Sequence, residues 1–125
     1  MERLDTDATG LAELVRRGDV HPSELVDASI AAIEASDPVI NAVVQRRFEQ
    51  ARAEAGGPLP DGPFRGVPFL LKDYGAEVAG EPYHEGMAFL RDRSWRAAAD
   101  SAAVSSVCRR GAVYRSSSPS TDMTA

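Results

Sequence analysis

The residue best suited to chemistry is Lys72. It is the one lysine among 14 basic residues, and the others are all arginines. It ends an apolar run over residues 67–71. Arginine stays protonated in proteins, whereas a lysine buried beside apolar side chains can lose its proton. A neutral amine can act as a general base toward a hydroxyl nucleophile. The alternative is an ordinary lysine at a strand end, paired with Asp73 or extended into water.

Residue spacing excludes several other kinds of site. The two histidines, His21 and His84, and the single cysteine lack the spacing of a zinc site. A Ser-x-x-Lys motif is excluded because Phe69 stands three residues before the lysine. Residues 75–80 have the glycine spacing of a phosphate-binding loop, but Glu-Pro follows where Lys and Ser or Thr are needed. We therefore expect neither a metal nor an organic cofactor.

The elements that would position the lysine begin with helices, which we expect within residues 9–55. Apolar residues recur at helical spacing over 9–17, where Gly18 is suited to ending the helix, and again over 22–36. Pro22 suits the first position of the second helix. The Asp-Pro pair that follows predicts its end, because proline disfavours a helical residue before it.

A loop and a strand are predicted after these helices. Residues 39–44 are ambiguous and open to an extended conformation, and a third helix is expected over 45–55. Prolines and glycines at 56–64 predict a loop. The apolar run with its lysine, residues 66–73, is bounded by chain-breaking residues and predicts a buried strand. Pro68 must then lie near the start of the strand or at a sheet edge.

The remaining sequence predicts a long loop and one more helix. Residues 74–97 lack clear periodicity and indicate a loop with short local structure. A helix is expected over 100–110, with Asp100 as its N-cap and Gly111 as its stop. The Ala-Val-Tyr segment that follows could begin another strand. The Ser- and Thr-rich tail, residues 116–125, is expected to be irregular.

Length and element order favour an α/β fold. The chain has 125 residues and a mass of 13.4 kDa, which corresponds to one domain or part of one. Helices come first, followed by strand, loop, helix and strand. Two short strands cannot form a well-covered parallel sheet, so the sheet is expected to be incomplete. Its open edges would favour self-association.

Composition excludes several classes of partner. A net charge of −5 and a pI near 5.0 argue against a general nucleic-acid binder. No apolar run approaches the roughly 20 residues that span a bilayer, and the first residues lack the layout of a signal peptide. The single cysteine, Cys108, excludes an internal disulfide and suits a reducing compartment. We expect a cytoplasmic protein without nucleic-acid or membrane partners.

Three segments resemble the amidase signature family. Residues 66–73, Gly-Val-Pro-Phe-Leu-Leu-Lys-Asp, resemble its G-V-P-x-x-x-K-D segment. Residues 80–87 resemble the loop that follows, and residues 100–113 resemble the family's D-S-x-x-V helix running into G-A-V. The resemblance covers roughly residues 9–114. It implies that residues 1–125 form a partial amidase signature domain, with helices preceding the first strands of a mixed sheet.

The resemblance also implies a chemistry, the hydrolysis of carbon–nitrogen bonds in small linear amides by a Ser–cis-Ser–Lys triad. Lys72 would be the catalytic lysine and exchange a proton with a bridging serine, while backbone N–H groups hold the oxyanion. The family's serines lie in a Gly/Ser-rich segment that this sequence does not reach. Residues 116–118 are serines without flanking glycines, so no serine role is assigned to them. We expect the isolated chain to be inactive. The alternative is a non-catalytic fragment, or an interaction module that folds only with a partner chain.

Overall fold

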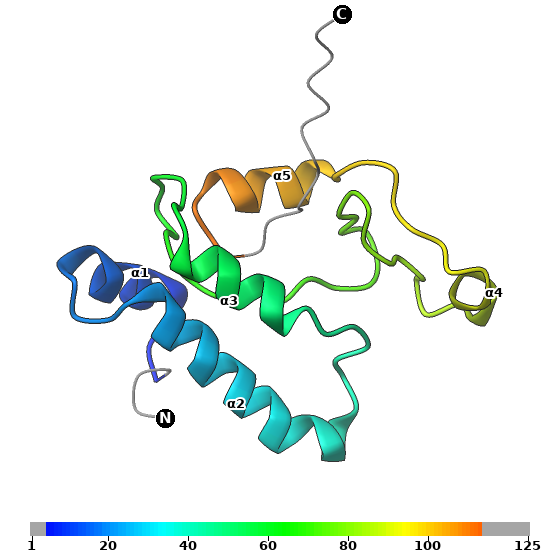
Figure 1. The fold of residues 1–125 in the computed structure, drawn as a ribbon, viewed down its shortest axis with the longest axis horizontal. Coiled ribbons are helices and arrows are strands. Elements are labelled where there is room, and N and C mark those ends of the chain that lie inside the picture. The colour runs from blue at the N-terminus through cyan, green and yellow to red at the C-terminus, as the bar shows by residue number, and fades with distance from the viewer. Residues whose placement is uncertain (1–4, 114–125) are drawn as a thin grey trace, which may run out of the picture. The chain divides into compact units, whose positions relative to one another are not determined.

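The computed structural model describes residues 5–113, which divide into two compact units. The first unit comprises residues 5–71 and 105–113, and the second comprises residues 72–104. The helices are α1 (Ala8–Arg17), α2 (Pro22–Ile40), α3 (Phe48–Gly56), α4 (Ala88–Asp92) and α5 (Ala102–Arg109) (Figure 1). Within residues 5–113, no helix is long and apolar enough to cross a membrane. The tail at 116–125 lies outside the described residues.

Local sequence signals set the end of α1 and the start of α2. Gly18 ends α1 with a φ of 77°, in the left-handed region that favours glycine. Pro22 occupies the first position of α2, where its missing N–H costs nothing. The Glu24 carboxylate accepts a 2.8 Å hydrogen bond from the His21 N–H just before the helix. The predictions for Gly18 and Pro22 are confirmed.

Helix α2 continues through Pro38 to Ile40, so its predicted end at residue 36 is wrong. Asp37 is only 6% exposed, and its carboxylate accepts hydrogen bonds of 2.7 and 2.9 Å from the N–H groups of Ala42 and Val43. The Val43 N–H has the largest influence on this carboxylate and lowers the pKa of Asp37. These hydrogen bonds hold the residues that follow the helix and compensate for the destabilising effect of Pro38. The proline lies in the last turn and removes only one helical hydrogen bond. Sequence periodicity alone does not reveal this anchor.

The core of the first unit consists of two clusters of buried apolar side chains. The first cluster contains Leu11, Ala12, Val20, Leu25 and Val67. The second contains Val26, Ile30, Ala55 and Val113. Helices α2 and α3 pack against each other (Figure 1). Leu25 is fully buried, and burial of such a side chain contributes about 1.5–3 kcal/mol.

Two segments far apart in the sequence pair through their backbones within the first unit. The N–H groups of Phe64, Gly66 and Val113 donate 2.9 Å hydrogen bonds to the carbonyls of Arg110, Gly111 and Val67, respectively. Pro68 and Val113 form an isolated parallel bridge. The strands predicted over 66–73 and after Gly111 are not confirmed, because no strand is formed within residues 5–113. Pro68 has no N–H to extend the pairing, and no third segment of the described chain joins it.

The second unit is built from turns, as predicted for residues 74–97. Pro82 and Arg96 form an isolated antiparallel bridge. Beside it, the Gly80 N–H donates to the Ala97 carbonyl at 2.8 Å, and the Ala97 N–H donates to the Glu81 carbonyl at 3.0 Å. The five-residue helix α4 is the short local structure expected within this loop. These backbone contacts give the unit its order with few buried side chains.

The helix predicted over 100–110 is observed as α5, but its start differs from the prediction. The Asp100 carboxylate accepts a 2.8 Å hydrogen bond from the Ala79 N–H, so the prediction that it caps α5 is wrong. Ser101 takes that place, and its Oγ accepts a 3.3 Å hydrogen bond from the Val104 N–H. A contact 21 residues away in sequence thus overrides the local capping preference of the aspartate.

Gly111 is a position where only glycine fits. Its φ is 86°, and a Cβ there would lie 2.6 Å from the Pro60 carbonyl oxygen. We expect Gly111→Ala to lower the free energy of unfolding by about 1–3 kcal/mol, because left-handed backbone and a backbone clash must both be accommodated. Urea unfolding followed by circular dichroism measures this.

The matched control for this substitution is Gly56→Ala at the end of α3. A Cβ at Gly56 meets no atom within 4 Å, so an alanine there should leave stability unchanged or raise it slightly. Equal unfolding midpoints for Gly111→Ala and the unaltered chain would contradict the analysis.

Candidate active site

Lys72 is the first residue of the second unit, and its side chain is exposed. Part of the apolar run before it is also open, with Phe69 45% and Leu70 69% exposed. The burial expected from the sequence is therefore found at Val67, which lies in the first core cluster, but not at Phe69, Leu70 or Lys72. The structure places Lys72 at the surface, where its amine is accessible.

Asp73, the residue after the lysine, has an ordered set of partners. Its Oδ1 accepts a 2.9 Å hydrogen bond from the His84 N–H, and its Oδ2 accepts a 3.2 Å hydrogen bond from the Gly86 N–H. Both carboxylate oxygens are thus used by one turn at residues 84–86. The ion-pairing role considered for Asp73 from the sequence is replaced by an anchoring role toward the backbone.

The electrostatics of Asp73 follow from these contacts. Partial burial alone would raise its pKa, but hydrogen bonds from the N–H groups of residues 84–86 outweigh burial, and the pKa of Asp73 is lowered. The carboxylate is therefore ionised at neutral pH and is a strong acceptor. Its hydrogen bonds give residues 72–73 a fixed connection to the turn.

Tyr83 provides a second connection between the same two segments. It is 7% exposed, and its hydroxyl accepts a 2.7 Å hydrogen bond from the Gly75 N–H and donates at 2.9 Å to a Glu85 carboxylate oxygen. The Gly75 N–H favours the phenolate, yet burial and the Glu85 carboxylate prevail and raise the pKa of Tyr83. The hydroxyl thus remains a donor at neutral pH.

The turn at 84–86 is the part of the candidate site that sequence reasoning missed. Glu85 and Gly86 have φ angles of 52° and 69°, both in the left-handed region. His84 buries its Nε2 atom without a hydrogen-bond partner among the described residues, and such an atom is stabilised when a polar group reaches it. The one local signal for this turn was the Glu-Gly pair, which is too common to identify an anchored turn.

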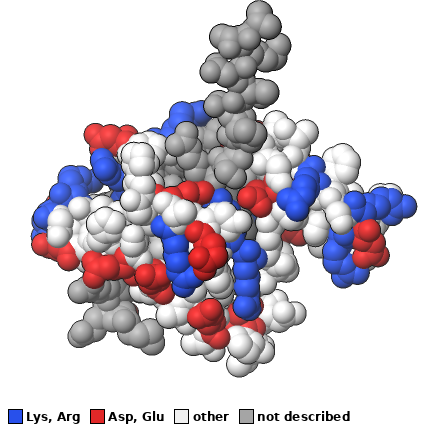
Figure 2. All heavy atoms as spheres, viewed as in Figure 1, with Lys and Arg blue, Asp and Glu red and all other residues white. Residues whose placement is uncertain are grey.

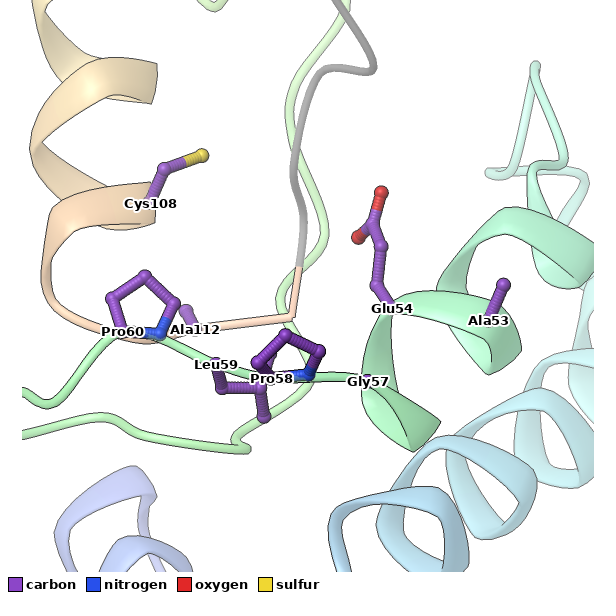
Figure 3. Close-up of a pocket in the computed structure, with 8 residues that line it drawn as sticks. All are labelled: Ala53, Glu54, Gly57, Pro58, Leu59, Pro60, Cys108 and Ala112. Carbon is purple, nitrogen blue, oxygen red and sulfur yellow. The ribbon is translucent and has the colours of Figure 1, made fainter.

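The first unit contains a cavity of about 200 Å³ (Figure 3). It is lined by Ala53, Glu54, Gly57, Pro58, Leu59, Pro60, Cys108 and Ala112. Its lining is mainly apolar, and the Glu54 carboxylate forms a 2.7 Å ion pair with Arg47. The cavity lies between α3, the proline-containing loop and α5, and the described partner of its carboxylate is Arg47.

On the face drawn in Figure 2, charges are intermixed rather than gathered by sign. Arg52 contacts Asp27 at 2.9 Å and Glu49 at 2.7 Å. In the part of the chain that the structure describes, no three His, Cys, Asp or Glu side chains gather so that they could hold a metal ion. The groups that the described residues bring together at the candidate site include the Lys72 amine, the Asp73 carboxylate and the backbone N–H groups of the 84–86 turn.

Comparison with known proteins identifies the class to which this arrangement belongs. The family model described as Amidase matches residues 24–119, which include Lys72, Asp73 and the turn at 84–86. The chain therefore belongs to the amidase signature family, and the resemblance noted from the sequence is confirmed.

Individual relatives agree with this assignment. The chain is 41% identical over 99 residues to the 6-aminohexanoate-cyclic-dimer hydrolase of Paenarthrobacter ureafaciens, a match covering 78% of the chain and 20% of the hydrolase. The solved structure of 6-aminohexanoate cyclic dimer hydrolase with substrate matches with a TM-score of 0.79 and 40% identity, over 86% of the chain and 22% of that structure. A bacterial aryl acylamidase of the amidase signature family matches with a TM-score of 0.74 and 30% identity, covering 86% and 24%, respectively. The chain thus spans about a fifth of the length of these relatives.

The Asp73 carboxylate predicts a pH dependence for the turn. Because its pKa is lowered, its stabilising hydrogen bonds are fully present above the ordinary aspartate pKa and are lost as pH falls through the lowered value. We expect the amide resonances of His84 and Gly86 to stay constant down to pH about 4 and to shift below it. An NMR titration measures this, and a midpoint above the ordinary aspartate pKa would contradict it.

Proposed function

We propose that this chain supplies Lys72 to an amide-hydrolysing site, in which the lysine exchanges a proton with a bridging serine and that serine activates the nucleophile. Both serines come from sequence outside this chain, so the chain alone is inactive toward small linear amides. The covering that excludes water from the lysine comes from the same source. The two serines and one lysine act as a unit, because a lone lysine has no nucleophile to activate.

The observation that carries this proposal is the position of Lys72 within the matched segment. It lies in the Gly-Val-Pro-Phe-Leu-Leu-Lys-Asp sequence inside residues 24–119, and the next residue anchors a second segment of the match. Of the relatives named above, one is a hydrolase of the 6-aminohexanoate cyclic dimer and another is an aryl acylamidase. An exposed amine on an anchored backbone is available to meet a serine supplied by further chain.

A hybrid enzyme tests the role of Lys72. Residues 24–113 of this chain replace the matching segment of the 6-aminohexanoate-cyclic-dimer hydrolase, and hydrolysis of the cyclic dimer is measured. We expect Lys72→Ala to lower kcat by about 10²–10⁴-fold, the usual contribution of general acid–base catalysis. Lys72→Arg should fail equally, because arginine cannot give up its proton.

The controls separate chemistry from folding in this experiment. Arg91→Ala removes another exposed cation of the second unit and should leave kcat unchanged. Thermal melting of each hybrid shows whether the variant is folded. If Lys72→Arg retained activity, a positive charge at residue 72 would be sufficient, and the proposed proton exchange would be overturned. Hydrolysis by the isolated chain that disappears in Lys72→Ala would overturn the claim that the serines lie elsewhere.

A second function, an interaction module, is favoured by one specific observation. The paired segments at 64–68 and 110–113 form only an isolated bridge, and beside it Phe69 and Leu70 are 45% and 69% exposed. An exposed apolar segment with unpaired backbone groups is suited to pairing with a second chain. Under this proposal, two copies of the chain associate through residues 69–71.

Size-exclusion chromatography with light scattering tests this association. We expect the chain to form dimers or larger species at micromolar concentration, and Leu70→Glu to shift it toward the monomer, because a charge would be buried in the contact. Val44→Glu is the matched control, since Val44 is 77% exposed and lies outside the paired segments. A stable, folded monomer of the unaltered chain would contradict the proposal.

A further inference from the structure

The side chain that follows Lys72 makes a nonlocal connection close to the lysine. Asp73 is half-buried and receives hydrogen bonds from backbone groups 11 and 13 residues away in sequence. Each carboxylate oxygen accepts from a different N–H, at 2.9 Å from His84 and 3.2 Å from Gly86. A two-point attachment fixes the orientation of the carboxylate as well as its position.

The turn that binds Asp73 has the geometry of an anion-binding concavity. Glu85 and Gly86 have positive φ angles of 52° and 69°, which turns successive N–H groups of residues 84–86 toward one point. A positive φ is disfavoured for a residue with a side chain, such as Glu85. The turn is thus held in a conformation that it would not favour alone, and the carboxylate is the group that compensates.

Tyr83 adds a second attachment between the same two segments, residues 73–75 and 83–86. Its hydroxyl receives the Gly75 N–H at 2.7 Å, so the segment 73–75 is attached to the segment 83–86 at both ends. The backbone immediately after Lys72 is therefore determined by contacts with a distant turn. The lysine itself takes no part in these contacts and is exposed.

We propose that Asp73 is the positioning residue of the Lys72 amine: by binding the N–H groups of the 84–86 turn, it fixes the point and direction in which the lysine side chain leaves the backbone. This inference rests on the proposed function of Lys72. The Cα atoms of adjacent residues are about 3.8 Å apart, so a rotation at residue 73 is transmitted directly to the lysine. Proton transfer requires heavy atoms within about 3 Å, and a displacement of about 1 Å costs on the order of 10²-fold in rate.

The single lysine makes this proposal testable in the 125-residue chain itself. Reductive methylation with isotope-labelled formaldehyde places NMR-visible methyl groups on Lys72 and on the N-terminal amine, which serves as an internal reference. In Asp73→Asn, one carboxylate oxygen is replaced by an N–H₂ group that cannot accept a hydrogen bond. We expect the Lys72 methyl resonance to shift, and exchange of the His84 and Gly86 amides to become about tenfold faster or more.

Two further variants separate the role of Asp73 from general effects. Asp92→Asn removes a carboxylate of the same unit that is 64% exposed and pairs only with the adjacent Arg91 among the described contacts, and it should change neither signal. Tyr83→Phe removes the other attachment of the turn and should speed exchange at Gly75 while leaving the Lys72 methyl resonance near its original position. If Asp73→Asn prevents folding, acidification of the unaltered chain removes the carboxylate charge without a substitution.

The outcomes distinguish this inference from the proposed function. A Lys72 resonance that is unchanged in Asp73→Asn, or that does not follow the Gly86 amide on acidification, would overturn the positioning role even if Lys72 proves catalytic. Conversely, the Lys72 methyl and Gly86 amide resonances could shift together while Lys72→Arg is fully active in the hybrid enzyme. That result would support the positioning contact and overturn the proposed function of Lys72. In the hybrid, Asp73→Asn should lower kcat with little change in KM, because the substrate contacts are retained.

Discussion

The first unit depends on the backbone pairing between residues 64–67 and 110–113. Three hydrogen bonds of 2.9 Å join segments that are more than 40 residues apart, and the contact places Val67 in one buried cluster and Val113 in the other. Glycines permit this approach, since a Cβ at Gly66 would lie 2.7 Å from a Pro22 side-chain atom and one at Gly111 would meet a carbonyl oxygen. Closing so long a loop costs chain entropy, which burial of apolar side chains must offset.

Sequence signals predicted those parts of the fold that local chemistry decides. Gly18 and Pro22 mark helix ends because their backbone preferences act within one turn. The same reasoning failed where a distant group competed. Helix α2 passes the proline because Asp37 anchors the residues that follow, and Asp100 binds the Ala79 N–H instead of capping α5. The apolar run at 66–73 predicts a strand because an apolar pattern indicates a local preference, whereas a stable strand also needs neighbouring strands to pair with.

The candidate site shows the same division between local and distant information. The lysine was found from its residue type and its place in a motif, both of which are visible in the sequence. Its surroundings were not predicted, because they depend on hydrogen bonds from residues 84–86 to Asp73 and on the buried hydroxyl of Tyr83. The adjacent residues Lys72 and Asp73 thus differ in what they do. Lys72 carries the amine, and Asp73 attaches the backbone to the turn at 84–86.

The exposure of Lys72 links the fold of this chain to the chemistry proposed for it. A general base must hold a neutral amine, and water at an open surface favours the charged form. The described residues provide an anchored backbone but leave Phe69, Leu70 and the lysine in solvent. Under the two proposals, position and environment are separable: residues 73 and 84–86 determine where the amine emerges, and groups other than the described residues determine whether it is shielded from water. Under the proposed function, a segment that matches about a fifth of the length of its relatives can position the lysine without being active by itself.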